Sequence, residues 1–111
     1  MNVVETSIPD LIVLEPSVFG DERGHFFESF RQDIFKEIGV DANFVQDNQS
    51  LSARGILRGL HFQKNPHAQG KLVRVVQGSV LDVAVDIRLG SPSYGQHYKI
   101  ELTASNKKMM Y

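Results

Sequence analysis

The stretch SVLDVAVDIRL, residues 79–89, shows the clearest strand pattern in the chain. Every second residue from Leu81 to Leu89 is aliphatic, whereas Asp82, Asp86 and Arg88 fall between them. Successive side chains of an extended strand point to opposite faces, so this alternation separates an apolar face from a charged one. The stretch therefore predicts a β-strand in a sheet whose two faces differ.

Shorter runs of the same kind recur along nearly the whole chain. We expect one helix near Gln32–Ile38, because Ile34, Phe35 and Ile38 share a face and Gly39 suits the left-handed position after a helix. About seven strands with one helix is typical of a jelly roll or barrel rather than of βαβ units. The further strands are expected at Leu11–Glu15, His25–Phe30, Asn43–Ser52, Ile56–Gln63, Lys71–Gln77 and His97–Thr103.

Length and composition limit what the protein can be. A chain of 111 residues without an internal repeat forms one domain at most. The net charge is -1 and the basic residues are scattered, so neither nucleic acid nor an acidic membrane surface is an expected partner. The chain has no cysteine, which excludes disulfides and thiolate chemistry. The N-terminus has no signal-peptide pattern and no long apolar run, so we expect a cytoplasmic protein.

The stretch GILRGLHFQKNPHAQGKLVRVVQ, residues 55–77, carries the candidate chemistry. It sets the imidazole of His61 among the cations Arg58, Lys71 and Arg74. A histidine can act as a general base near neutral pH, and a fixed cation can stabilise the anion that forms. The simpler alternatives are a histidine bonded to a backbone carbonyl and a solvated lysine at a strand end.

Arg58 and His61 pose a geometric problem. They are three residues apart, so a regular strand would point them to opposite faces. Both can reach one pocket only if the backbone is irregular between them. Gly59 is the residue at which we expect that irregularity.

A second polar set lies in the N-terminal third. Arg23 falls in an expected tight turn from Asp21 to Gly24, and Glu28 shares a strand face with Phe26 and Phe30. Burying an unpaired glutamate between two phenylalanines is costly, so Glu28 is either exposed at an edge or faces a ligand.

A polar row follows in the next expected strand. Gln46, Asn48 and Ser50 share one of its faces, which suits hydroxyl groups or a uracil-like or thymine-like base.

We expect no metal site. Small β-barrels that bind metal commonly use a His-x-His pair followed by a glutamate. Here the corresponding run is His61-Phe62-Gln63, and no glutamate follows until Glu101.

Several sequence blocks together resemble the dTDP-4-dehydrorhamnose 3,5-epimerase family. They are VFGDERGHFFESF, FVQDNQS, LRGLHFQ, QGKLVRVVQGSVLDVAVDIRLGSPSYGQ and LTASNKK, in the family's order. The resemblance implies a cupin-type jelly roll, or double-stranded β-helix, with residues 1–111 as a single, partial domain. It also implies a metal-free and cofactor-free homodimer in which N-terminal strands are shared across the interface.

The resemblance implies a reaction and roles for particular residues. The family epimerises C3 and C5 of dTDP-4-dehydro-6-deoxy-D-glucose through enolate intermediates in dTDP-L-rhamnose biosynthesis. His61 resembles the general base, and Lys71 resembles the cation that stabilises the enolate. The matching substrate-binding positions are Arg23, Phe26, Glu28, Gln46, Asn48 and Arg58.

This chain departs from the family pattern after residue 111. The family continues into a region that supplies a tyrosine acid and the carboxylate that pairs with the catalytic histidine. We therefore expect a truncated epimerase that is impaired or inactive by itself. The alternatives are a non-catalytic dimerising or nucleotide-sugar-binding remnant, and a related ketosugar-nucleotide isomerase or monoepimerase.

Overall fold

The computed structural model describes residues 1–111 and contains eight short strands and one helix. The expected all-β class with one short helix is therefore confirmed. The elements are β1 Asn2–Glu5, β2 Ile12–Glu15, β3 Val18–Asp21, β4 Gly24–Phe27, α1 Gln32–Glu37, β5 Val73–Arg74, β6 Ser79–Val85, β7 His97–Thr103 and β8 Met109–Met110.

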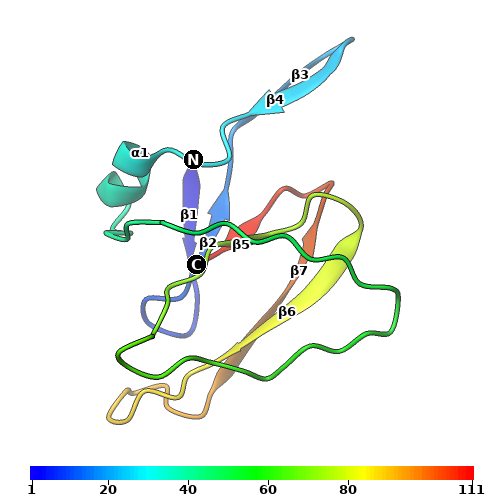
Figure 1. Cartoon of the computed structure of the whole chain (residues 1–111). Coiled ribbons are helices and arrows are strands. Elements are labelled where there is room, and N and C mark those ends of the chain that lie inside the picture. The colour runs from blue at the N-terminus through cyan, green and yellow to red at the C-terminus, as the bar shows by residue number, and fades with distance from the viewer.

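The strands form three antiparallel groups, and no closed barrel is present. A four-stranded sheet has the order β1-β2-β8-β5, while β3 pairs with β4 and β6 pairs with β7. Figure 1 shows that α1 lies beside β1 and that the β3–β4 hairpin projects away from the rest of the molecule. The radius of gyration is 15.0 Å, against about 13 Å for a compact chain of this length. The molecule is therefore open and elongated.

The main core lies between the four-stranded sheet and α1. Leu14 on β2, Met109 on β8, Phe35 on α1 and Val40 just after the helix form one fully buried cluster. Phe44 packs on the same cluster, with its ring centroid 6.2 Å from that of Phe35. The hydrophobic periodicity of the helix thus places its apolar face on the sheet.

The expected helix and most expected strands form. The helix has the expected start, and Gly39 has a φ of 88°, the left-handed conformation expected after it. The strand His97–Thr103 forms as expected, and the strands expected at Leu11–Glu15, His25–Phe30, Lys71–Gln77 and Ser79–Leu89 form over shorter ranges.

Two expected strands are absent, which corrects the sequence prediction. Residues 43–52 and 56–63 form neither helix nor strand. A strand needs a neighbour to which its backbone N–H and C=O groups can bond, and no other segment of the chain pairs with these two runs. Apolar alternation alone therefore did not identify a strand here.

The charged face of β6 is the less exposed one. Asp82 is half-buried and Asp86 is 4% exposed, whereas Leu81 and Val83 on the opposite face are exposed. Asp82 lies opposite Ile100 of β7, and Asp86 directly follows the last residue of β6.

Asp86 tolerates burial because a network of donors surrounds its carboxylate. The Arg88 guanidinium donates to both oxygens at 3.0 and 2.9 Å, and the hydroxyls of Ser91 and Ser93 each donate at 2.6 Å. Arg88 also donates to Asp10 at 2.8 Å, which ties this turn to the loop between β1 and β2. These bonds, led by that of Arg88, hold the pKa of Asp86 far below its usual range.

Replacing Ser93 tests this network. Ser93→Ala removes one charge-assisted hydrogen bond from a buried position, so the free energy of unfolding should fall by about 2 kcal/mol in urea denaturation. The stabilisation belongs to the ionised carboxylate, whose pKa is lowered. It should therefore be present at neutral pH and be lost only as the pH falls through the lowered pKa.

The exposed Ser7 supplies the control. Ser7→Ala should change stability by less than about 0.5 kcal/mol. Equal effects of the two substitutions would contradict a structural role for the network.

Candidate functional site

Lys71 begins the segment that enters the four-stranded sheet. Two residues later, β5 pairs with β8, and Leu72 packs against the main core. Gly70 lies directly under the ring of Tyr111, where an added Cβ would come within 2.8 Å of the phenolic oxygen. The backbone of Lys71 is thus held from both sides, while its side chain is exposed.

His61 lies in the irregular segment between residues 41 and 72. Its side chain is exposed and makes no hydrogen bond or ion pair with another residue. Gly59, between Arg58 and His61, has a φ of 124°, which L-residues rarely adopt. The expected irregularity at Gly59 is confirmed, although the strand around it is not.

Arg58 folds back on its own segment. Its Nε donates to the Ser52 hydroxyl at 2.9 Å, and a terminal nitrogen donates to the Leu51 carbonyl at 3.3 Å. The guanidinium is exposed, and its remaining donors are free to bind a phosphate or carboxylate. The structure does not bring Arg58, His61 and Lys71 into contact with one another.

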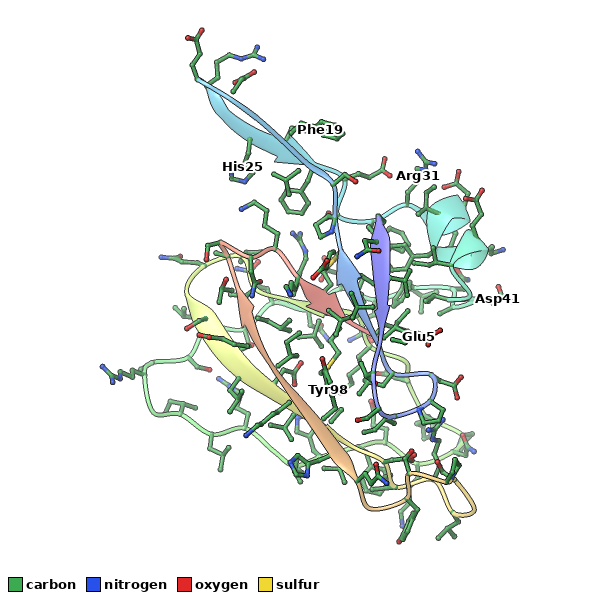
Figure 2. All side chains as sticks on the ribbon, turned by 180° about the vertical axis from the view of Figure 1, so that it is seen from behind. Glu5, Phe19, His25, Arg31, Asp41 and Tyr98 are labelled. Atoms are coloured by element: carbon green, nitrogen blue, oxygen red, sulfur yellow. The ribbon has the colours of Figure 1, made fainter.

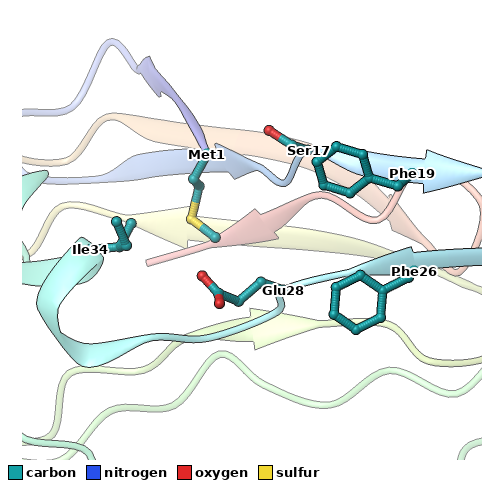
Figure 3. Close-up of a pocket in the computed structure, with 6 residues that line it drawn as sticks. All are labelled: Met1, Ser17, Phe19, Phe26, Glu28 and Ile34. Atoms are coloured by element: carbon teal, nitrogen blue, oxygen red, sulfur yellow. The ribbon is translucent and has the colours of Figure 1, made fainter.

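Phe26 and Glu28 come together at the base of the β3–β4 hairpin. Both line a cavity of about 270 Å³, shown in Figure 3, in which the rings of Phe26 and Phe19 extend from paired strands. Met1, Ser17 and Ile34 complete its wall.

Glu28 is exposed, and its carboxylate lies 3.7 Å from the guanidinium of Arg31. Glu28 is thus exposed, as the first of its two alternatives expects, and it also lines the cavity, so a ligand-facing role stays a prediction. An exposed acid beside two aromatic rings can accept a hydrogen bond from a planar ligand that stacks on those rings.

Arg23 lies at the far tip of the projecting hairpin, in the expected turn from Asp21 to Gly24. Its guanidinium donates to Asp21 at 3.1 and 3.2 Å, and this contact lowers the pKa of that carboxyl. Figure 2 shows Phe19 and His25 further down the same hairpin. Arg23 is exposed and makes its side-chain contacts only within the hairpin.

Gln46 and Asn48 lie on the irregular segment and contact each other. The Gln46 amide donates to the Asn48 side-chain oxygen at 3.3 Å, and both residues are exposed. The structure thus gathers the candidate residues into separate groups rather than into one closed pocket.

Asp82 is not among the residues that the sequence pattern predicts for the site. One of its carboxylate oxygens is buried without a hydrogen-bond partner, and burial raises the pKa of this carboxyl against an opposing bond from the Val83 backbone. The sequence signal that could have identified it is an acidic residue between aliphatic ones, within the alternating stretch at residues 79–89.

Two other features are absent from the structure, a metal-binding cluster and a membrane-spanning helix. No group of three or more His, Cys, Asp or Glu residues is placed to hold a metal ion. No helix is long and apolar enough to cross a membrane.

Comparison with known proteins identifies the fold and the family. The sequence profile described as dTDP-4-dehydrorhamnose 3,5-epimerase matches residues 5–111. The Shigella flexneri dTDP-4-dehydrorhamnose 3,5-epimerase is 56% identical over the whole of this chain, which covers 62% of that protein.

Solved structures agree with the sequence match. The epimerase of Elizabethkingia anophelis superposes with a TM-score of 0.94 at 49% identity, over 100% of this chain and 61% of that one. The epimerase of Legionella pneumophila, in complex with dTDP-4-keto-L-rhamnose, has a TM-score of 0.93 at 50% identity, over 98% and 58%.

The fold is therefore of the cupin type, all-β with open sheets. The chain belongs to the dTDP-4-dehydrorhamnose 3,5-epimerase family, and it spans about three-fifths of the length of these relatives.

Replacing Asp82 tests whether its ionised carboxylate lowers the free energy of unfolding. A raised pKa means that the folded state binds the proton more tightly, so ionisation at neutral pH destabilises the fold. Asp82→Asn should therefore raise the free energy of unfolding by about 1 kcal/mol at pH 7. The gain should shrink as the pH falls below the usual carboxyl range, where Asp82 is neutral in both states. Urea denaturation across pH 3 to 7 measures the difference, and a gain independent of pH would contradict the assignment.

Proposed function

We propose that this chain carries the base-and-cation half of a dTDP-4-dehydrorhamnose 3,5-epimerase site. The substrate would be dTDP-4-dehydro-6-deoxy-D-glucose, whose C3 and C5 protons both lie α to the C4 ketone. His61 would remove such a proton, and Lys71 would stabilise the oxygen of the resulting enolate. The observation that carries the proposal is the family match over residues 5–111, which includes both residues.

The structure meets the requirement for Lys71 but not the requirement for His61. An electrostatic stabiliser must be fixed in place before reaction, and the Lys71 backbone is anchored by β5, by the packing of Leu72 and by the close approach of Gly70 to Tyr111. A general base needs its second ring nitrogen held by a partner, and His61 has no such contact within the chain. We therefore expect slow proton removal rather than efficient turnover from residues 1–111.

The remaining predicted residues would bind the nucleotide. Arg58 would contact the diphosphate or the sugar. Phe26 and Glu28, beside the cavity at the hairpin, would contact the base, with Gln46 and Asn48 supplying further hydrogen bonds. Arg23 lies in the turn between β3 and β4, and this hairpin projects from the rest of the molecule (Figure 1), so Arg23 can reach a second copy of the chain. This placement supports a homodimer with shared N-terminal strands as part of the proposal.

A non-catalytic nucleotide-sugar-binding protein is the second candidate. The observation that favours it is the unsupported His61 imidazole, since a base without an orienting partner loses much of its advantage. Proton exchange separates the two candidates, because it requires only the base and the enolate stabiliser.

Deuterium exchange at the sugar is the test of His61. With the 4-ketosugar nucleotide in heavy water, deuterium should enter C3 or C5 without efficient inversion, as followed by NMR at both carbons. His61→Asn should reduce this exchange by at least about 100-fold. Exchange at one carbon alone would indicate a monoepimerase.

His67 provides a matched control, because it is an exposed histidine of the same segment. His67→Asn should leave the exchange unchanged. Retained exchange in His61→Asn would exclude His61 as the base, and the absence of any exchange in the unmodified chain would favour the binding protein.

Lys71 is tested by the same assay. Lys71→Ala should slow the exchange by about 100-fold or more, because the enolate oxygen loses its cation. Lys64→Ala, at another exposed lysine of the segment, should have little effect. Equal rates in the two variants would show that Lys71 has no electrostatic role.

A further inference from the structure

The β3–β4 hairpin has few contacts that could fix its direction. No hydrogen bond or ion pair joins residues 18–27 to a residue outside the hairpin, which projects from the end of β2 (Figure 1). A two-stranded ribbon is only marginally stable in water by itself. Arg23 and Phe26 lie on this hairpin and Glu28 follows it directly, so the direction of the hairpin decides where these side chains stand.

The two faces of the hairpin carry different side chains. Phe26 and its cross-strand partner Phe19 lie on one face and line the cavity of about 270 Å³. His25 and Phe27 alternate with Phe26, so they lie on the other face, where their rings stack with centroids 6.1 Å apart. Phe26 is 71% exposed, whereas Phe27 is half-buried. The face of Phe27 is therefore the one that contacts the rest of the molecule.

Lys107 contacts Phe27 from the turn between β7 and β8. Its Nζ lies 5.9 Å from the centroid of the Phe27 ring, within the range of a cation–π interaction. The same ammonium group donates to the Ala104 carbonyl at 3.0 Å, so it is held between the turn and the ring. The Lys107 side chain is half-buried, and a cation–π contact is stronger where water is partly excluded.

The turn that carries Lys107 is closely bonded. The side-chain oxygen of Asn106 accepts from the backbone N–H groups of Thr103 and Lys108 at 3.1 and 3.0 Å. Its amide donates to the Glu101 carbonyl at 2.9 Å. Lys107 itself has a φ of 56°, the left-handed conformation that a lysine rarely adopts and that persists only where the surroundings hold it. The turn thus presents the Lys107 ammonium group from a fixed backbone.

We propose that Lys107 is a positioning residue, which sets the direction of the β3–β4 hairpin and so places Phe26 and Glu28 for contact with the nucleotide base. Lys107 does not touch the ligand in this role, because it acts through Phe27 on the opposite face. A hairpin that is already oriented loses less freedom when the ligand binds. The identity of the ligand rests on the proposed function, whereas the contact between Lys107 and Phe27 does not.

Distances between spin labels test the positioning without any ligand. The chain has no cysteine, so Glu22→Cys in the hairpin turn and Lys99→Cys on β7 give two labelled sites. Double electron–electron resonance, with labelled chain diluted in unlabelled chain, reads distances within one molecule. Lys107→Met keeps the length of the side chain but loses its charge, so it should broaden the distance distribution by about twofold or more. Lys107→Arg should keep the distribution narrow, because a guanidinium also binds a ring face.

Lys108 provides the matched control. It is a half-buried lysine of the same turn, but its ammonium group pairs with Glu15 on β2 at 2.8 Å rather than with the hairpin. Lys108→Met should therefore leave the distances unchanged. Phe27→Leu removes the ring from the other side of the contact and should broaden the distances as Lys107→Met does, which keeps the test valid if one variant folds poorly.

Binding of dTDP and of inorganic pyrophosphate measures the consequence at the site. Both ligands carry a diphosphate group, but only dTDP carries the base that Phe26 and Glu28 would contact. In isothermal titration calorimetry, Lys107→Met should weaken dTDP binding by about fivefold and leave pyrophosphate binding unchanged, because only the base contacts depend on the hairpin. A general loss of structure would weaken the binding of both.

Two outcomes would overturn the positioning role of Lys107. One is an equal width of the distance distribution in Lys107→Met and in the unmodified chain. The other is an equal loss of dTDP affinity in Lys107→Met and Lys108→Met. Broadened distances in Lys107→Met, together with no dTDP binding by the unmodified chain, would confirm that Lys107 orients the hairpin and would contradict the proposed function instead.

Discussion

The two-residue strand β8 is the constraint on which the rest of the structure depends. Met109 and Met110 pair with β2 on one side and with β5 on the other, so they join the N-terminal strands to the segment that carries Lys71. Met109 is also fully buried in the main core with Phe35. Without this strand, β5 would have no place in a sheet, and the backbone of Lys71 would be as free as that of His61.

Asp82 on β6 and Asp86 directly after it show how hydrogen-bond partners decide whether a charge with little exposure is stable. Asp86 is surrounded by an arginine and two serine hydroxyls, so its ionised form is strongly favoured. Asp82, four residues earlier, has one oxygen without any partner, and burial raises the pKa of its carboxyl. The donors that distinguish Asp86 from Asp82 come from Arg88, Ser91 and Ser93, in the turn before β7.

The sequence predicted elements that carry a clear pattern of their own, including β5, whose partner β8 lies far along the chain, but it missed β1 and β3 although each pairs with the next strand. β6, β7 and α1 were found because each carries its own periodicity, and β7 pairs with β6 through a short connection. Met109–Met110 was missed as a strand, since two residues show no period, and its identity depends on distant neighbours. Residues 43–52 and 56–63 have strand-like alternation but no neighbouring strand. The prediction of strands there was wrong because a pairing partner is missing, although the residues themselves favour a strand. For the site, the arrangement of the candidate residues could not be predicted from sequence, because the projection of the hairpin and the path of the loop depend on tertiary structure.

Tyr111 gives the irregular segment between residues 41 and 72 an unexpected property. Its ring centroid lies 6.0 Å from that of Phe44 near one end of the segment, and its phenolic oxygen lies against Gly70 near the other end. One aromatic side chain thus fastens both ends of a loop whose middle is free. In polymer terms, the two ends of the segment are already held close together, so ordering its middle should cost less entropy than ordering a free tail of equal length.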